Sequence, residues 1–212
     1  MPGPARSSYE SENNRSADTL EPLLPVGHSE GRMQDQAEQD LIDRAKAGDR
    51  MAYEGLLAPM VLPATRLAFA MLHDRSEAED AFQESALRAW RRLRNLRPGR
   101  PFRPWFIGIV GNQCREVRRG HWWHVVRLSE YSAVQPVDEE AWLEGEDLRR
   151  AVQQLPYNQR LAVLMHFHLD MPLNDVALAL GISVPGVKTR INRALRRLRP
   201  AIAVSEPTSI HG

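Results

Sequence analysis

The chain has 212 residues, of which 42% are hydrophobic and 26% charged, and its formal net charge is +1. This length allows two small domains with hydrophobic cores, and the composition excludes a collagen-like, disulfide-stapled or wholly disordered chain. The sequence shows no apolar run near the roughly 18 residues of a membrane span and no signal-peptide core, so we expect a soluble cytoplasmic protein. The single cysteine, Cys114, excludes an internal disulfide and a cysteine-rich zinc site, and we expect it to be buried.

Charge is strongly segregated along the chain. Residues 1–40 contain three arginines and eight acids, and residues 86–127 contain eleven arginines and a single acid. Residues 128–147 contain seven acids and no base, and residues 186–199 contain six bases and no acid. Two basic blocks separated by an acidic spacer predict two anion-binding surfaces. The alternative, solvated helix faces, would normally interleave both signs.

The first elements in chain order are a tail and two helices. Residues 1–34 lack apolar periodicity and are predicted to be disordered. Helical periodicity then runs as far as Gly48, and Asp49 is a candidate cap for the second helix. Pro59 and Pro63 fall inside that helix and predict a kink or a break.

Two further helices complete the predicted first domain, residues 35–120. One is expected over 76–93 with Ser76 as its N-cap, and the other over 103–119. The apolar core positions expected in the latter are Trp105, Phe106, Ile109 and Val110.

The second half of the chain is predicted to be a linker and a second helical domain. Residues 121–146 are expected to form a flexible acidic linker, residues 147–200 a domain, and residues 201–212 a tail. Helices are expected near 173–180 and 184–198, and no convincing strand pattern occurs in the sequence. The fold class is therefore predicted to be all-α, with two small domains.

The spacing of Ala177, Gly181 and Val187 is typical of a helix-turn-helix. The second helix is predicted to bury Val187, Ile191, Ala194, Leu195 and Leu198. Its opposite face would present Lys188, Thr189, Asn192, Arg193, Arg196 and Arg199, with Arg190 and Arg197 on the flank. These residue types bond base edges and phosphates in the major groove, so we expect DNA binding here. The alternative is a surface helix of a helical bundle.

Two stretches resemble a known family. SEAEDAFQESALRAWRRL followed by FRPWFIGIVGNQCREVRR resembles region 2 of bacterial RNA polymerase sigma factors of the extracytoplasmic-function (ECF) group, and residues 148–199 look like their region 4. The resemblance implies two helical domains that bind core RNA polymerase, direct it to a promoter and open the −10 element. It also implies an alternative sigma factor, often controlled by an anti-sigma factor, that is not an enzyme and has no cofactor or metal.

The resemblance implies a role for three groups of residues. The helix over 76–93 would bind the clamp of the largest catalytic polymerase subunit through Asp80, Gln83, Glu84, Arg88 and Arg91. The −10 element would be bound by Arg100, Arg103, Asn112, Arg115, Arg118 and Arg119, with a base pocket between the loop 96–101 and Asn112. The −35 contacts are expected from Lys188, Thr189, Arg190, Asn192, Arg193 and Arg196 of the helix-turn-helix. Phe102 and Trp105 are candidate stacking platforms, although core packing is the commoner role of such aromatics.

The residues alone leave two alternatives to the resemblance. One is an ordinary transcription regulator that reads a palindrome as a dimer. The other is a metal-dependent enzyme using His166 and His168, which residues two apart on a helix disfavour because they face different ways. The promoter sequence, the inducing signal, the anti-sigma factor and the roles of the N-terminal tail and of His121-Trp122-Trp123-His124 are left open.

Overall fold

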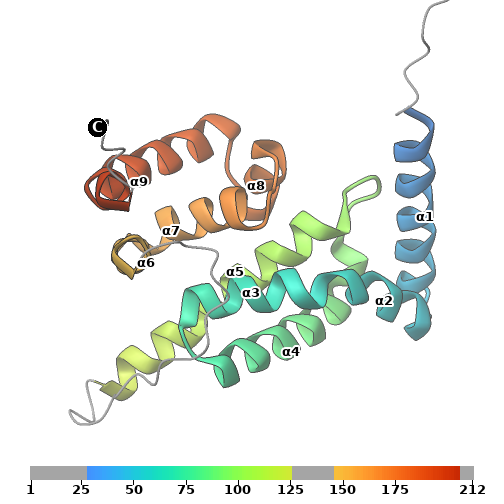
Figure 1. Cartoon of the computed structure of the whole chain (residues 1–212). Helices are drawn as coiled ribbons and strands as arrows, with labels where there is room; N and C mark the ends of the chain where they lie inside the picture. The colour runs from blue at the N-terminus through green and yellow to red at the C-terminus, as the bar shows by residue number, and fades with distance from the viewer. Residues whose placement is uncertain (1–27, 126–145, 206–212) are drawn as a thin grey trace, which may run out of the picture.

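The computed structural model describes the backbone of residues 28–125 and 146–205, and the side chains of residues 36–120 and 147–202. Within these ranges the chain is helical and contains no strand, as predicted (Figure 1). The elements are α1 (His28–Lys46), α2 (Arg50–Leu57), the 3-10 turn η1 (Ala58–Met60), α3 (Val61–Leu72), α4 (Arg75–Arg92), the 3-10 turn η2 (Leu93–Asn95), α5 (Phe102–Val125), α6 (Glu146–Gln153), α7 (Tyr157–Val163), the π-helical turn η3 (Leu164–His168), α8 (Leu173–Leu180) and α9 (Val184–Ser205).

The break between the first helices follows from the residues that form it. Gly48 takes a left-handed φ of +101°, and the side chain of Asp49 accepts a hydrogen bond from the backbone N–H of Ala52 at 3.1 Å, which confirms the predicted cap. Pro59 lies in η1, where the α-helical hydrogen bonding is interrupted between α2 and α3. The predicted break is therefore confirmed.

The N-cap of α4 lies two residues before the predicted Ser76. The N-cap is Asp74, which has extended backbone angles and accepts from the N–H of Glu77 at 2.8 Å, whereas Ser76 already lies inside the helix. Aspartate is at least as good a cap as serine, and its position allows Glu77 to fall in the first turn, near the positive end of the helix dipole.

Three helices run beyond their predicted ends. α1 includes residues 28–34, which were expected to belong to the disordered tail, and α5 includes residues 121–125, which were expected to belong to the linker. α9 continues past its predicted end at 198 to Ser205, with Pro200 inside it. The extension over 28–34 lacks the apolar periodicity on which the prediction relied, but its Glu, Arg, Met and Gln favour helix by propensity alone. The remaining parts of the predicted tails and linker lie outside the described residues.

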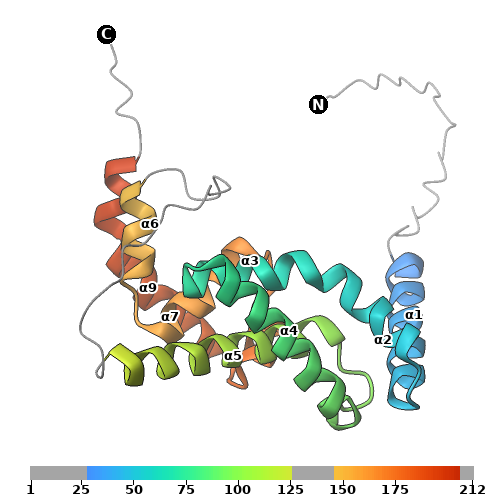
Figure 2. The ribbon, with the colours of Figure 1, turned by 90° about the horizontal axis from the view of Figure 1, so that it is seen from below.

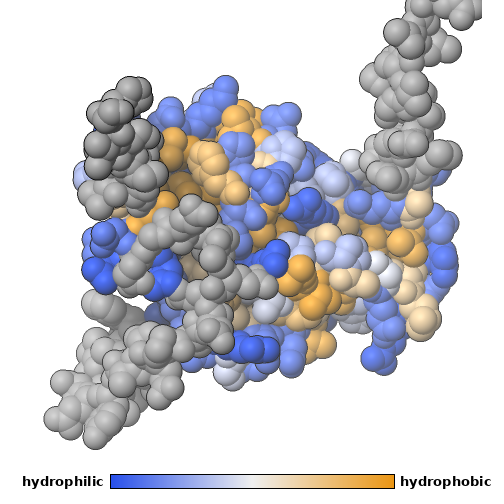
Figure 3. Space-filling view, in the orientation of Figure 1, coloured by the Kyte–Doolittle hydropathy of each residue, from blue (hydrophilic) through white to orange (hydrophobic). Residues whose placement is uncertain are grey.

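The stretch Arg50–Leu72 is long and apolar enough to cross a membrane by length and composition, contrary to the expectation that no such run exists. Its buried residues, among them Ala64 and Leu67, pack against α4 and α5 in the bundle core. Its outward side carries exposed Val61 and Leu62, and a hydrophobic patch is visible over α3 in Figure 3. A core helix of a soluble protein has these same properties.

The N-terminal helices form a bundle around α5. α3 packs on α4 and α5, while α1 packs on α2 at one end of the bundle (Figures 1 and 2). The rings of Phe102 and Phe106 stack with centroids 5.6 Å apart at 8°, and Tyr53 lies against Trp90 at 4.9 Å. The prediction that Phe106 and Val110 are core residues is confirmed, whereas Trp105 and Ile109 are only partly buried.

The C-terminal helices form a second group that is docked on the first. α6, α7 and α8 pack on α9, and α8 also lies along α5. Gly108 of α5 makes this close approach possible, because a Cβ there would overlap the carbonyl oxygen of Ala179 in α8. One turn further on, a Cβ on Gly111 would lie 3.0 Å from the side chain of Leu161 in α7. We call this contact between α5 and the α7–α8 segment the glycine seam.

Candidate nucleic-acid interface

The helix-turn-helix is built as the sequence predicts. Gly181 ends α8 with a left-handed φ of +63°, and its N–H is bonded to the carbonyl of Ala177. Ala177 and Val187 are 7% and 0% exposed, so the two helices touch at these positions. The turn therefore fixes the N-terminal half of α9 against α8, with the opposite face of that half exposed.

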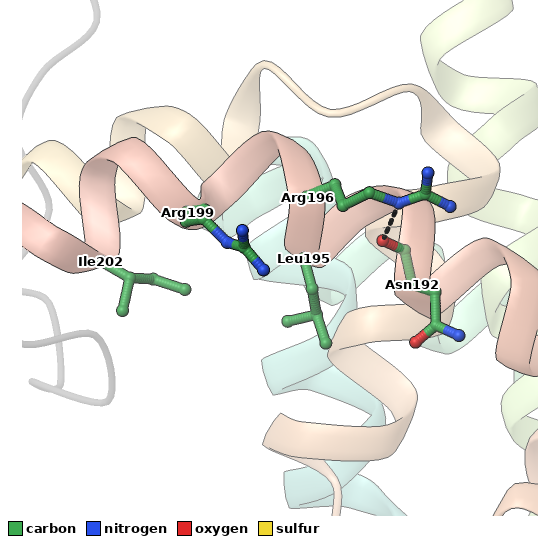
Figure 4. A pocket seen from close by; sticks show the side chains of 5 residues that line it. All are labelled: Asn192, Leu195, Arg196, Arg199 and Ile202. Carbon is green, nitrogen blue, oxygen red and sulfur yellow. Dashed lines mark hydrogen bonds between the residues drawn. The ribbon is translucent and has the colours of Figure 1, made fainter.

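The buried face of α9 consists of Val187, Ile191, Ala194 and Leu198, as predicted. Leu195 was assigned to this face wrongly, because its side chain is 36% exposed. Together with Ile202 it lines a hollow beside Asn192, Arg196 and Arg199 (Figure 4). The rotation of 100° per residue places position 195 beyond the edge of the buried stripe.

The opposite face of α9 is open to solvent. Lys188, Thr189, Asn192, Arg193 and Arg196 are exposed and Arg190 is half-buried. None of these cations has an ion-pair partner among the described residues. Two side chains of this face form hydrogen bonds to the backbone of α9 itself. The Thr189 hydroxyl donates to the Pro185 carbonyl at 2.9 Å, and Arg196 Nε donates to the Asn192 carbonyl at 3.4 Å (Figure 4 shows the latter).

The residues expected to bind the −10 element are divided by the structure. Arg100, Asn112, Arg118 and Arg119 are exposed, whereas Arg103 and Arg115 are half-buried. Arg103 Nη2 donates to the Leu169 carbonyl at 2.6 Å, and Arg115 Nη2 donates to Asn158 Oδ1 at 2.8 Å. Both acceptors belong to the C-terminal domain, which therefore binds two of the predicted DNA contacts.

Tyr157 strengthens this engagement of α5. The guanidinium carbons of Arg115 and Arg118 lie 4.9 and 5.6 Å from the centroid of its ring, within the range of a cation–π contact. The Tyr157 hydroxyl donates to the Gly111 carbonyl, and burial raises the pKa of that hydroxyl above its usual value. Of the candidate stacking platforms, Phe102 is 1% exposed and cannot face a base in this arrangement.

A second polar contact between the domains was not anticipated from the sequence. Arg160 is 3% exposed, and desolvation followed by repulsion from Arg118 lowers its pKa to about 10. Its Nη1 lies 3.3 Å from the Gln153 carbonyl and 3.3 Å from Nε2 of His73, the residue that ends α3. Burial, and then the charge of Arg160, lowers the pKa of His73 to about 4. No sequence pattern distinguishes this arginine from the surface arginines around it.

The residues expected to bind polymerase lie on α4. Asp80, Gln83 and Arg91 are exposed, as a docking stripe requires. Glu84 and Arg88 form an ion pair at 2.8 Å, and this pairing lowers the pKa of Glu84. Arg88 also bonds Glu116 of α5 at 2.6 Å, so it links two helices in addition to facing outward.

One residue of this α4 face was missed by sequence reasoning. Leu87 is 52% exposed and follows Gln83 by one helical turn. The sequence could have identified Leu87, because it lies four residues after Gln83 and four residues before Arg91. It is therefore an apolar side chain on the polar side of the helix.

His166 and Cys114 are accounted for by packing. His166 Nδ1 lies 2.8 Å from the Met171 carbonyl, and the described residues contain no group of three His, Cys, Asp or Glu that could hold a metal ion. Cys114 is buried, as predicted, and desolvation raises the pKa of its thiol to about 12.

Comparison with known proteins shows the family to which the two helical domains belong. Residues 59–124 match the family described as Sigma-70 region 2 and residues 145–198 match Sigma-70, region 4, together more than half of the chain. The chain is 30% identical over 181 residues to the ECF RNA polymerase sigma factor SigM of Mycobacterium tuberculosis, covering 82% of this chain and 91% of the relative. It is 28% identical to RfaY of Xanthomonas campestris pv. campestris, named as a probable RNA polymerase sigma factor, covering 86% of this chain but only 45% of that relative.

Solved structures share the fold. CnrH, in complex with the cytosolic domain of CnrY, aligns with a TM-score of 0.62 at 22% identity over 80% of this chain and 99% of that chain. The sigma factor RpoE, in complex with the anti-sigma factor NepR from Bartonella quintana, aligns with a TM-score of 0.60 at 22% identity over 73% of this chain and 98% of that chain.

Proposed function

The chain belongs to the RNA polymerase sigma factors of the ECF group, DNA-binding initiation factors that are not catalysts, and on this premise we propose how its surfaces divide the work. It is an alternative sigma factor that acts with core RNA polymerase on promoter DNA. The single observation that carries the assignment of surfaces is the open cationic face of α9 beside a complete helix-turn-helix.

The N-terminal half of α9 reads the −35 element. Lys188 and Arg190 neutralise phosphates, while Asn192 and Arg193 reach base edges, where arginine can form two hydrogen bonds to guanine. Thr189 and Arg196 border this contact. The absence of ion-pair partners among the described residues means that no internal bond to a carboxylate has to be broken before α9 binds DNA.

The −10 element is bound by α5 and the preceding loop. Arg100 and Arg119 are exposed and neutralise the backbone of the separated strand, and Asn112 faces an extruded base. Arg103, Arg115 and Arg118 join them once the C-terminal domain leaves the glycine seam.

The exposed stripe of α4 binds the polymerase clamp. Asp80, Gln83 and Arg91 supply polar contacts, with Leu87 as an apolar contact at the centre. Glu84 and Arg88 contribute through their ion pair, which fixes both side chains on the stripe.

Reading both elements requires the two domains to separate. The names of the elements place their centres about 25 base pairs apart, which is about 85 Å of duplex at about 3.4 Å per base pair. In the docked arrangement α9 packs on α8 and α8 on α5, so their axes lie within about 20 Å at about 8–10 Å per packed helix pair. The docked form therefore cannot span a promoter, and the active form is an open one.

An anti-sigma factor is the expected regulator. A protein of similar fold, the sigma factor RpoE from Bartonella quintana, is solved in complex with the anti-sigma factor NepR, and another, CnrH, in complex with the cytosolic domain of CnrY. A protein partner that binds the docked form would keep Arg103 and Arg115 away from DNA. The protein acts in the cytoplasm, where core polymerase and the chromosome are found.

Run-off transcription with reconstituted core polymerase over a library of promoters tests this function. The expected result is initiation that depends on the chain and selects both a −10 and a −35 sequence. Binding of a palindromic site by a dimer, with no effect on polymerase, would instead identify an ordinary transcription regulator.

A further inference from the structure

The loop that joins η2 to α5 is held by the N-terminal helix. Lys46 of α1 donates from Nζ to the Leu96 carbonyl at 2.8 Å, at the start of the loop. Glu38 accepts at Oε1 from the Phe102 N–H at 2.5 Å, at the end of the loop. Between them, Gln39 Oε1 accepts from the Gly99 N–H at 3.3 Å. One helix therefore bonds the loop at both ends and in its middle.

The bond from Glu38 caps α5. The first N–H groups of a helix have no partner within the helix, and a carboxylate there is favoured by the helix dipole. The residue that receives this cap, Phe102, is also fixed by its side chain, which is 1% exposed and stacked on Phe106. The start of α5 is thus set by a residue 64 positions earlier in the chain.

The bonds to Leu96 and Gly99 shape the part of the loop that faces solvent. Gly99 has a left-handed φ of +69°, and the Arg100 N–H donates to the Arg97 carbonyl at 3.2 Å, so the loop is a tight turn. Arg97 and Arg100 project from this turn and are exposed. Figure 1 shows the loop beside α1, at the end of the bundle away from α9.

Packing of α1 does not by itself require these polar bonds. Ile42 and Ala45 are 2% and 3% exposed and attach α1 to the bundle, while Leu41 packs near Gly55 of α2. Glu38, Gln39 and Lys46 lie beside this apolar stripe, half-buried, and their side chains are directed to the loop.

We propose that Glu38, Gln39 and Lys46 are positioning residues for −10 recognition: they hold the loop 96–101 in the conformation that forms one wall of the base pocket and so determine which base the pocket accepts. The inference rests on the proposed −10 role of the loop and α5. These residues contact the loop and not the reading surface, and they act by keeping that wall within a fraction of an ångström of its working position.

The experiment uses the full chain assembled with core polymerase and single-stranded −10 oligonucleotides that differ at one base. Glu38→Ala and Lys46→Ala are expected to reduce the preference for the best base by about tenfold, the equivalent of one weakened contact. Glu38→Gln keeps an acceptor oxygen and is expected to retain most of the preference. Asp40→Ala is the matched control, because Asp40 is an exposed carboxylate of α1 paired with Arg44 on the same helix.

Binding of −35 duplexes and thermal unfolding separate positioning from a purely structural role. The expected −35 affinity of Glu38→Ala is that of the unchanged protein. An unchanged −10 preference in both Glu38→Ala and Lys46→Ala overturns the proposal, and so does an equal loss of −10 and −35 binding. A failure of the underlying function looks different, because the unchanged protein itself would then show no −10 preference.

Discussion

α5 and α9 carry similar residues that we propose to bind DNA, but these residues differ in what they contact. Both helices present an asparagine among arginines on one face. On α9 that face is open, whereas on α5 Arg103 and Arg115 donate to the C-terminal domain and Arg118 lies over the Tyr157 ring. The two helices therefore differ in that the C-terminal domain supplies acceptors to the arginines of α5, whereas the cations of α9 stay exposed.

The glycine seam combines close packing of helix backbones with a buried arginine that has no acidic partner among the described residues. Gly108 and Gly111 let helix backbones approach, and the buried residues of both domains form one continuous cluster. The same boundary buries Arg160, which among the described residues has no carboxylate partner and forms hydrogen bonds with Gln153 and His73. A buried, unpaired charge is costly, so the docked form is stable by fit and weakened by electrostatics.

Substitution of Gly108 by alanine should have the largest effect on the docking of the C-terminal domain against α5. The added Cβ would overlap the Ala179 carbonyl oxygen, a backbone atom that cannot rotate away, and overpacking of this kind costs about 1–3 kcal/mol. We expect the equilibrium constant for docking to fall by about fivefold to about a hundredfold, since 1.4 kcal/mol corresponds to a factor of ten. Small-angle X-ray scattering should then show an increased radius of gyration.

Two other glycines of α5 provide graded controls. Gly111→Ala meets the end of the Leu161 side chain, which can move, so its effect should be smaller. Gly120→Ala meets nothing within 4 Å and should stabilise α5 by up to about 1 kcal/mol through helix propensity. Equal scattering profiles for all three variants would contradict the glycine seam as the cause of docking.

Acid should open the same contact. The pKa of His73 is lowered to about 4 in the docked form, and the charged groups that act on it, Arg160, Arg118 and Arg149, are all cations. The separated or unfolded state binds a proton near pH 6.5, so the contribution of neutral His73 to docked stability is complete above that pH, falls as the pH drops toward 4, and changes little further below about 4. We expect a loss of about 1–3 kcal/mol, measured by thermal unfolding and scattering between pH 7 and 4.

The matched variant for this pH effect is His73→Gln. It keeps a hydrogen-bonding side chain next to Arg160 but does not titrate, so the difference between the two pH profiles isolates the histidine. Parallel profiles for the two proteins would mean that acid acts on other groups.

The C-terminal fold was more predictable than the contact between domains. The Ala177, Gly181 and Val187 spacing is local, because a turn glycine and two apolar contacts depend only on neighbouring residues. Gly108 reads in the sequence only as a weak point in a helix, since its role depends on Ala179 more than 70 residues away. Docking depends on a close fit between residues that are far apart in the sequence, and the helical periodicity of a single segment does not reveal this fit.

The candidate sites divide in the same way. The exposed face of α9 follows from helical periodicity, because the rotation of about 100° per residue assigns each side chain to a face without knowledge of the rest of the chain. The half-burial of Arg103 and Arg115 depends on acceptors at Leu169 and Asn158, and periodicity does not contain these. Leu87 shows the opposite error, since its apolar side chain was overlooked on a face considered polar.

The open helix can be tested by separating phosphate contacts from base contacts. Arg193→Ala should lose about 1–3 kcal/mol of discrimination at one −35 base pair, whereas Lys188→Ala should weaken all sequences and flatten the salt dependence. Titration of the polymerase complex over single-base −35 variants at two salt concentrations measures both. Arg199→Ala, further along the helix, is the control and should do little. Unchanged affinities and salt slopes in both variants would mean that α9 is only a solvated face.

The smallest expected effect is on DNA binding by Arg115 of α5, which is hydrogen-bonded to Asn158. Asn158→Ala removes the acceptor 2.8 Å from Arg115 Nη2 and leaves the glycine seam in place. An exposed bond to a charged group contributes about 0.5–1 kcal/mol, so the free chain should bind a single-stranded −10 oligonucleotide about two- to fivefold more tightly by fluorescence anisotropy. Asn174→Ala, an exposed asparagine of α8, is the control.

The polymerase complex supplies the discriminating measurement for that variant. If the domains are separated there, Arg115 is already released, and Asn158→Ala should leave the −10 affinity of the complex unchanged. A gain of equal size in the free chain and in the complex would show that Asn158 acts on DNA directly. No gain in either would show that the bond to Asn158 does not restrain Arg115, and the difference between α5 and α9 would then lie in the glycine seam alone.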